Sequence, residues 1–162
     1  MAMNDDLMHL GLVDEDEILL DEAALVLALP DHAGTDLAPY DDVLEAIAVR
    51  LAAVAGGSTA APEQAAALAT VLADEFGFVG DAKTYDDPAN ADLIRVIDRR
   101  RGLPVSLAIL YVAAARRLGW LANVLDVPGH VLVLIGEEAA PVVIDPSVAP
   151  CRLLRSGPQT DR

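Results

Sequence analysis

The sequence is poor in cysteine, in aromatic residues and in basic residues. Cys151 is the one cysteine, so no disulfide can form within the chain, and no cysteine-based metal site can be built from it. No apolar run is long enough to span a bilayer, and the N-terminus is acidic rather than basic before its apolar stretch. These absences argue against a disulfide scaffold, a membrane span and a secretory signal. We therefore expect a cytoplasmic protein.

The shortage of basic residues makes the chain strongly acidic. Eleven Lys and Arg stand against 26 Asp and Glu, which gives a formal net charge of -15. Because such a surface repels phosphate groups, we expect neither nucleic acid nor an anionic membrane as a partner. The acidic residues crowd the N-terminal end, where they either form a solvated face or dock a basic partner. We expect no cofactor, and the sequence leaves the oligomeric state open.

Helical patterns fill the first two-thirds of the sequence. Apolar residues recur at three- and four-residue steps, which predicts helices over about 15–29, 39–55, 59–76 and 88–101. A further helix, 105–118, is apolar almost all round, a pattern typical of a helix at the centre of a fold.

Strand patterns follow the last of these helices. Short β-branched runs predict strands over 121–127, 131–135 and 142–144, and the last two read as an antiparallel hairpin. Helices first and strands afterwards predict an α+β fold, in which one buried central helix lies against a small antiparallel β-sheet. The expected parts of this compact unit are an N-terminal helical part at 1–75, a core at 76–150 and a tail at 151–162.

One histidine, His130, has a context that favours chemistry. It opens an apolar strand, and Asp145 closes the next one. If the turn between them is centred between Glu137 and Glu138, the two residues face each other with Cβ atoms about 4.5–5.5 Å apart. A carboxylate at that distance can fix the imidazole tautomer and raise its basicity. The alternative is a strand-end histidine followed by an ordinary Asp-Pro turn. The other histidines, in polar stretches, are expected to have no specific role; they are His9 and His32.

The N-terminal end of the central helix is the place where a nucleophile would be expected, because the helix dipole stabilises an anion there. The stretch Gly102 to Ser106 contains no cysteine. The Ser106 hydroxyl could in principle be activated by His130; alternatively, Ser106 is an ordinary first-turn serine bonded to the backbone. Cys151 could act only if the tail folded back onto His130.

Several short motifs occur in a fixed order over residues 70–147. They are Phe76-Gly77-Phe78, Tyr85 to Asn90, Leu93, Arg99 to Leu107, Tyr111, Arg116 to Gly119, Pro128 to His130 and Asp145-Pro146. This order resembles the SirB-type branch of the transglutaminase-like proteins, which belong to the papain-like cysteine protease fold. The predicted N-terminal helices are also compatible with that family's helical part.

The resemblance implies that the catalytic nucleophile is missing. In active members of the superfamily the central helix begins with Gly-x-Cys, and a His and an Asp lie on successive strands. Aligned without gaps, Pro104 takes the place of the Cys, whereas His130 and Asp145 take those of the His and the Asp. The SirB-type branch typically carries Gly-x-Pro at this point. The binding residues implied by the family motif are Tyr85, Asn90, Arg101 and Pro104.

The chain departs from the branch near the expected site. Val131 stands where an aromatic residue usually follows the His, and the residues after Pro146 lack the usual aromatic residue and glycines. The alternative roles of the motif residues are structural. Asn90 would bond to loop backbone, and Arg101 would pair with one of two acids, Asp87 or Asp92.

Three functions follow from these patterns. The first, which the resemblance favours, is a non-catalytic module that binds a protein or peptide partner. The second is an enzyme that cleaves or transfers acyl groups of amides, with Ser106 as nucleophile, His130 as base and Asp145 as orienting residue. The third is a regulatory protein whose acidic N-terminal helices dock a basic partner.

Overall fold

The helices predicted over 39–55, 59–76 and 105–118 begin and end within two residues of those positions, whereas the helix predicted over 88–101 runs from Leu93 to Arg99. The first residues of the helix predicted over 15–29 lie outside the described part of the chain. The computed structural model describes residues 20–81, 87, 89, 91–128, 130–137, 139–147 and 152–155, the last four as backbone only. Its helices are α2 (Leu20–Ala28), the short 3₁₀ turn η2 (Leu29–Asp31), α3 (Ala38–Ala55), α4 (Ala61–Leu68) with its π-helical continuation η3 (Ala69–Glu75), α5 (Leu93–Arg99) and α6 (Pro104–Arg117). No helix in this part of the chain is both long and apolar enough to cross a bilayer.

Local sequence explains where α5 and α6 start and stop. The carboxylate of Asp92 accepts the backbone N–H of Arg95 and so caps the start of α5. Arg100 ends α5 with a φ of 60°, a left-handed conformation that is uncommon for residues other than glycine. Its guanidinium lies 4.9 Å from the centre of the Phe78 ring, and this contact offsets part of the backbone strain. Pro104 occupies the first turn of α6, where its missing N–H costs no hydrogen bond.

The strands form one antiparallel sheet and one short parallel ladder. The sheet has the order β3-β4-β5-β6 and consists of β3 (Ala122–Val127), β4 (His130–Ile135), β5 (Val142–Asp145) and β6 (Arg152–Arg155). The ladder joins β1 (Val79–Gly80) to β2 (Arg101–Gly102) just before α6. The predicted hairpin is confirmed, whereas β6 forms from residues that were expected to be a tail. The fold is α+β, as predicted.

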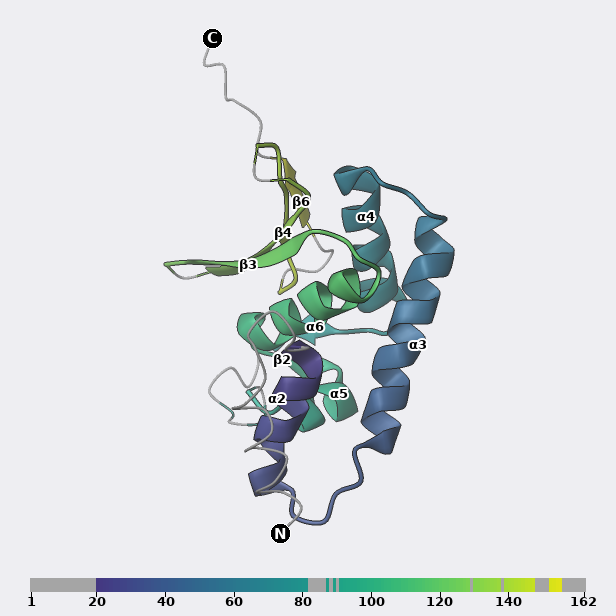
Figure 1. Ribbon diagram of the computed structural model, residues 1–162. Coiled ribbons are helices and arrows are strands. Elements are labelled where there is room, and N and C mark those ends of the chain that lie inside the picture. Colours follow the sequence, from purple (N-terminus) through teal and green to yellow (C-terminus); the bar gives the residue numbers. More distant parts are fainter. Residues whose placement is uncertain are drawn as a thin grey trace, which may run out of the picture.

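Helix α6 lies at the centre of the molecule, as its apolar pattern predicted. In Figure 1 it runs across the middle, with the sheet on one side and α2 and α5 on the other. Tyr111 and Leu107 of α6 are fully buried. On the sheet side, Val133, Ile135 and Ile144 are fully buried as well. Because α6 is held from both sides, the position of its first turn is fixed by the core.

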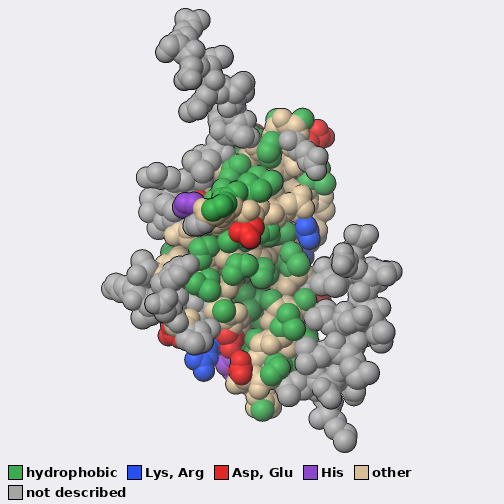
Figure 2. Space-filling model, turned by 90° about the vertical axis from the view of Figure 1, so that its left-hand side faces the viewer, with side chains coloured by type: hydrophobic (Ala, Val, Ile, Leu, Met, Phe, Trp, Pro, Cys, Tyr) green, Lys and Arg blue, Asp and Glu red, His purple; other side chains and the backbone are tan. Residues whose placement is uncertain are grey.

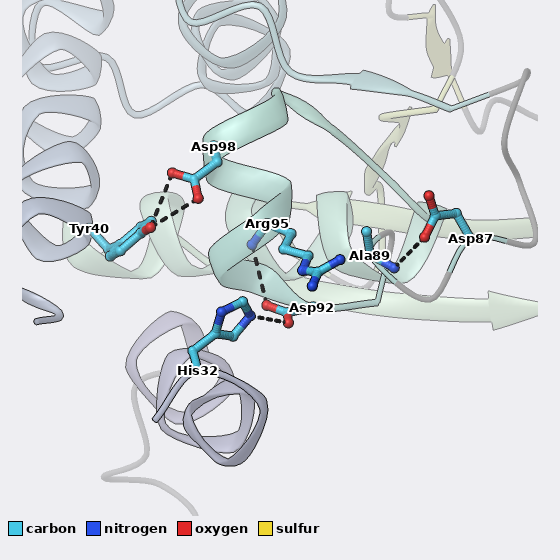
Figure 3. Close-up of polar contacts among 7 residues, drawn as sticks. All are labelled: His32, Tyr40, Asp87, Ala89, Asp92, Arg95 and Asp98. Carbon is cyan, nitrogen blue, oxygen red and sulfur yellow. Dashed lines mark hydrogen bonds and ion pairs between the residues drawn. The ribbon is translucent and has the colours of Figure 1, made fainter. Parts of the chain in front are cut away.

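Polar contacts tie α5 to the helices that precede it (Figure 3). His32 Nε2 lies 2.5 Å from Asp92 Oδ2, the carboxylate that also caps α5 through Arg95. The Tyr40 hydroxyl donates to Asp98 of α5 at 3.0 Å, and burial together with this bond raises the pKa of Tyr40. His32 was expected to have no specific role, but it joins η2 to α5. The sequence could not predict this role, because the partner of His32, Asp92, is 60 residues away and is brought close only by the tertiary fold.

Candidate functional site

A small pocket lies where the start of α6 meets the β3–β4 hairpin. Its volume is about 250 Å³, and it is lined by Leu103, Pro104, Val105, Asp126, Val127, His130 and Val131. Three of these residues come from the N-terminal end of α6 and four from the hairpin. Figure 2 shows the side of the molecule toward which the hairpin projects, with hydrophobic side chains gathered in a broad band down its middle.

The predicted register of the β4–β5 hairpin is wrong by two residues. Val133 pairs with Ile144, so Asp145 stands opposite Leu132 rather than opposite His130. A slip of two residues keeps every side chain on its own face of the sheet, because side chains alternate with a period of two. The hydrophobic pattern therefore could not distinguish the two registers.

His130 and Asp145 nevertheless remain on the same face as diagonal neighbours. His130 Nδ1 lies 3.9 Å from Asp145 Oδ2, which is an ion-pair distance but longer than a hydrogen bond. The imidazole side chain is 64% exposed, whereas the carboxylate is 10% exposed. Asp145 Oδ1 accepts the Ser147 hydroxyl at 2.6 Å and the Ser147 backbone N–H at 3.0 Å. Ser147 thus anchors the carboxylate at the end of β5, while the imidazole projects into solvent.

No hydroxyl or thiol lines the described part of this pocket. Pro104, which takes the place of the family's Cys, forms part of its wall, and its side chain has no nucleophilic atom. Ser106 is 4% exposed and is not among the lining residues. The structure therefore brings together Pro104, His130 and, behind the latter, Asp145. It does not bring the Ser106 hydroxyl to the pocket surface.

The remaining candidates contribute little to this pocket. Arg101 lies in β2 with an exposed side chain and is not a lining residue. Among the described residues, no ion pair joins Arg101 to Asp87 or Asp92. Asp92 contacts His32 instead, and Asp87 accepts the Ala89 N–H at 2.9 Å (Figure 3). Three further residues that the sequence singled out lie outside the described residues: Tyr85, Asn90 and Cys151.

Asp126 is the pocket residue that the sequence interpretation missed. It pairs with Val131 across the β3–β4 hairpin and is exposed at the pocket. A signal for it was present. The signal was the dipeptide Pro128-Gly129, which predicts a two-residue hairpin turn. With Val127 opposite His130, Asp126, one residue earlier in the strand, lies opposite Val131.

A larger hollow of about 710 Å³ lies elsewhere, between the α3–α4 connection, the start of β3 and the β4–β5 turn. Among the described residues, Glu137 is the one titratable residue that lines this hollow, and Trp120 is the one aromatic residue. The larger hollow also has polar lining residues, namely Ser58, Thr59 and Gln64. The smaller pocket at α6 is the better candidate site because it joins an exposed imidazole and a carboxylate to the first turn of the central helix, where the family resemblance places the chemistry.

The fold and the site together define a class of protein. A buried helix whose first turn meets a strand-borne His, with an Asp on the following strand, is the arrangement expected of a transglutaminase-like domain. The family model described as "Transglutaminase-like superfamily" matches residues 38–149, and the chain belongs to this superfamily.

Similar curated proteins carry names that state no activity. The chain is 31% identical over 138 residues to a "UPF0162 protein" of Xylella fastidiosa strain Temecula1. The match covers 85% of this chain and 49% of that protein. It is 36% identical over 75 residues to a "UPF0162 protein" of Vibrio cholerae, with 44% of this chain and 27% of that protein covered. It is 32% identical over 75 residues to mouse "F-box only protein 21", and the match covers 46% of this chain and 12% of that protein.

The chain spans about half the length of the first of these relatives. No solved structure matches it significantly.

Proposed function

We propose that this protein is a SirB-type, non-catalytic member of the superfamily, and that it binds a protein or peptide segment in the pocket between α6 and the β3–β4 hairpin. One observation carries the proposal. Pro104 lines the pocket at the place of the nucleophile, beside a retained His130. A family site that keeps its walls but lacks the reacting atom is suited to holding a segment rather than to cleaving it.

The geometry of the retained pair supports binding over catalysis. A general base needs a proton donor within about 2.6–3.2 Å and a partner that orients it. His130 Nδ1 is 3.9 Å from the carboxylate and the imidazole is largely exposed to solvent, so Asp145 does not orient the ring through a hydrogen bond. An exposed imidazole at the rim of a pocket can instead donate a hydrogen bond to a bound peptide carbonyl.

The charge of the chain favours a basic partner. The carboxylate of Asp126 is part of the pocket lining, and the formal net charge of the whole chain is -15. A basic segment would be attracted by the overall field and would find a carboxylate at the pocket itself. The carboxylate at the pocket and the net negative charge of the chain therefore both favour a basic segment.

Selection from a displayed library of random peptides tests this proposal. We expect the selected peptides to be basic, and to bind with unchanged mass after prolonged incubation with the protein. Val105→Lys, which places a cation at the 44% exposed pocket wall, should weaken binding at least about tenfold, since a loss of about 1.4 kcal/mol is sufficient.

Val49→Lys is the matched control. Val49 is 66% exposed on α3 and does not line the pocket, so this variant adds the same charge at a remote position and should bind normally. Equal binding by wild type and Val105→Lys would contradict the proposal. Cleavage of the peptides that disappears in Ser106→Ala would establish the enzyme instead. Binding that survives His130→Ala and Val105→Lys but is lost at high salt would indicate docking through the acidic helices.

A further inference from the structure

We infer that the bound segment joins the sheet as an additional β-strand along the outer edge of β3. The inference rests on the proposed function and specifies how the same site recognises its partner. Strand β3 is at one end of the sheet order, so one of its edges has no partner strand among the described residues. An unpaired edge of this kind offers a row of backbone donors and acceptors to an extended peptide.

The register identifies which backbone groups face outward. The Gly136 N–H donates to the Leu121 carbonyl at 3.0 Å, so every second residue from Leu121 onward directs its backbone groups toward β4. The residues between them, Ala122, Val124 and Asp126, therefore direct theirs to the outer edge. The Ala122 carbonyl accepts Arg116 Nε at 3.0 Å, which agrees with this assignment. The outward N–H and C=O groups of Val124 and Asp126 have no hydrogen-bond partner in the described structure.

Apart from the charge of Asp126, the edge lacks the features that usually prevent strand addition. Natural edge strands are blunted by charged side chains, above all lysine, by proline or by a β-bulge. Strand β3 has the sequence Ala-Asn-Val-Leu-Asp-Val, and its pairing with β4 runs without interruption from Ala122 to Val127. Arg116 occupies the outer edge of β3 at Ala122, so the part of this edge that suits a basic segment is the stretch from Val124 to Asp126, where the carboxylate lies.

Side chains on the edge define the chemistry of the segment. Val124 and Asp126 lie on the same face of β3, because they are two residues apart, and Val124 is 39% exposed. An added strand would place alternate side chains on that face, next to the pocket wall at Pro104 and Val105. The matching segment has a basic residue opposite Asp126 and an apolar residue, two positions away, opposite Val124.

Charge argues against a second copy of this chain as the occupant. Two chains would each bring a formal net charge of -15 to the contact. Like charges opposite each other across a strand pair are destabilising, and the overall repulsion slows association. A basic peptide has neither disadvantage.

The test uses two labelled peptides and one backbone substitution. The probe is Thr-Arg-Thr-Val-Thr, in which Arg and Val share a face, and its matched control carries Glu in place of Arg. Of the backbone hydrogen-bonding groups, Val124→Pro removes only the outward N–H, so the β3–β4 hydrogen bonds should survive. We expect the Arg probe to bind at least tenfold more tightly than the Glu control, and Val124→Pro to reduce its binding at least tenfold. Val124→Ala, which keeps the N–H, should retain most of the binding.

Backbone methylation of the probe provides a readout that does not depend on the folding of a variant. Methylation of a single amide should abolish binding at alternate positions only, because alternate N–H groups of an added strand face β3. Binding of the probe that is unaffected by Val124→Pro and by methylation at any position would overturn the strand-addition inference while leaving the proposed function intact. If neither the probe nor any library peptide binds, both fail. A dimer of the protein that Val124→Pro dissociates would also overturn the inference, in favour of a second copy.

Discussion

A buried carboxylate, Asp21, joins the first described helix to the central one. Asp21 Oδ2 accepts hydrogen bonds from Arg117 Nη2 at 2.8 Å and Nε at 3.0 Å. The Asp21 side chain is 2% exposed, and the two residues are 96 positions apart in sequence. No local pattern could have predicted this pair. It fastens α2 to the C-terminal end of α6, where a cation is also favoured by the helix dipole.

Loss of one partner from this pair should destabilise the fold. We predict that Asp21→Ala lowers the free energy of unfolding by about 2 kcal/mol, because it removes the buried carboxylate that accepts two hydrogen bonds from Arg117. The loss is smaller than for a fully buried pair, since the Arg117 side chain is 24% exposed and Glu22 remains 3.7 Å from it. Urea denaturation followed by circular dichroism measures the change. Glu75→Ala is the control, since its ion pair with Arg50 is exposed and should contribute much less. Equal losses in the two variants would show that burial is not what makes the Asp21 pair important.

At the scale of elements, the sequence predicted the long and periodic segments correctly. The apolar stripe of α3 and the all-round apolar pattern of α6 gave the right helices, and the β-branched runs gave β3, β4 and β5. The ladder between Val79–Gly80 and Arg101–Gly102 was not predicted, because two residues are too few to show a periodicity.

The motif order singled out Pro104 and His130, and both line one pocket. Their roles in binding stay predictions. The contact of Asp145 with Ser147, and its diagonal rather than direct relation to His130, could not be foreseen, since a two-residue slip leaves the hydrophobic faces unchanged. Asp126 was not predicted, because it is not one of the catalytic positions of the family.

The β1–β2 ladder lies tightly against the end of β5. A Cβ atom at Gly80 would be 2.7 Å from the backbone oxygen of Ser147, the residue that anchors Asp145. We predict that Gly80→Ala displaces this end of β5 and costs about 1–3 kcal/mol of stability, as overpacking usually does. The amide resonances of Asp145 and Ser147 should shift in the folded variant.

Ser147→Ala is the companion variant for this prediction. It removes the hydroxyl bond to Asp145 without crowding the backbone, so it should shift the same resonances with a smaller loss of stability. Wild-type stability and an unchanged spectrum in Gly80→Ala would mean that Gly80 and Ser147 are not in contact in solution.

At the scale of the whole molecule, the fold positions a rigid helix end against a projecting hairpin. Helix α6 is held between the sheet and α2 and α5, so its first turn is a fixed wall (Figure 1). The β3–β4 hairpin provides the other wall and a strand edge that has no partner strand in the part of the chain that the structure describes. Because the pocket and the strand edge are already formed, the protein itself need not become more ordered on binding. The entropic cost then comes mainly from ordering the peptide.

The central claim is that an extended basic segment binds, uncleaved, between the start of α6 and the edge of β3. The most direct measurement is the mapping of backbone amide shifts during titration of the isotope-labelled protein with the Arg-containing probe. The account predicts that the largest shifts occur at Val105, Val124, Asp126 and Val131, and that the peptide keeps its mass. Shifts gathered around Trp120 in the larger hollow, or a peptide hydrolysed during the titration, would contradict it.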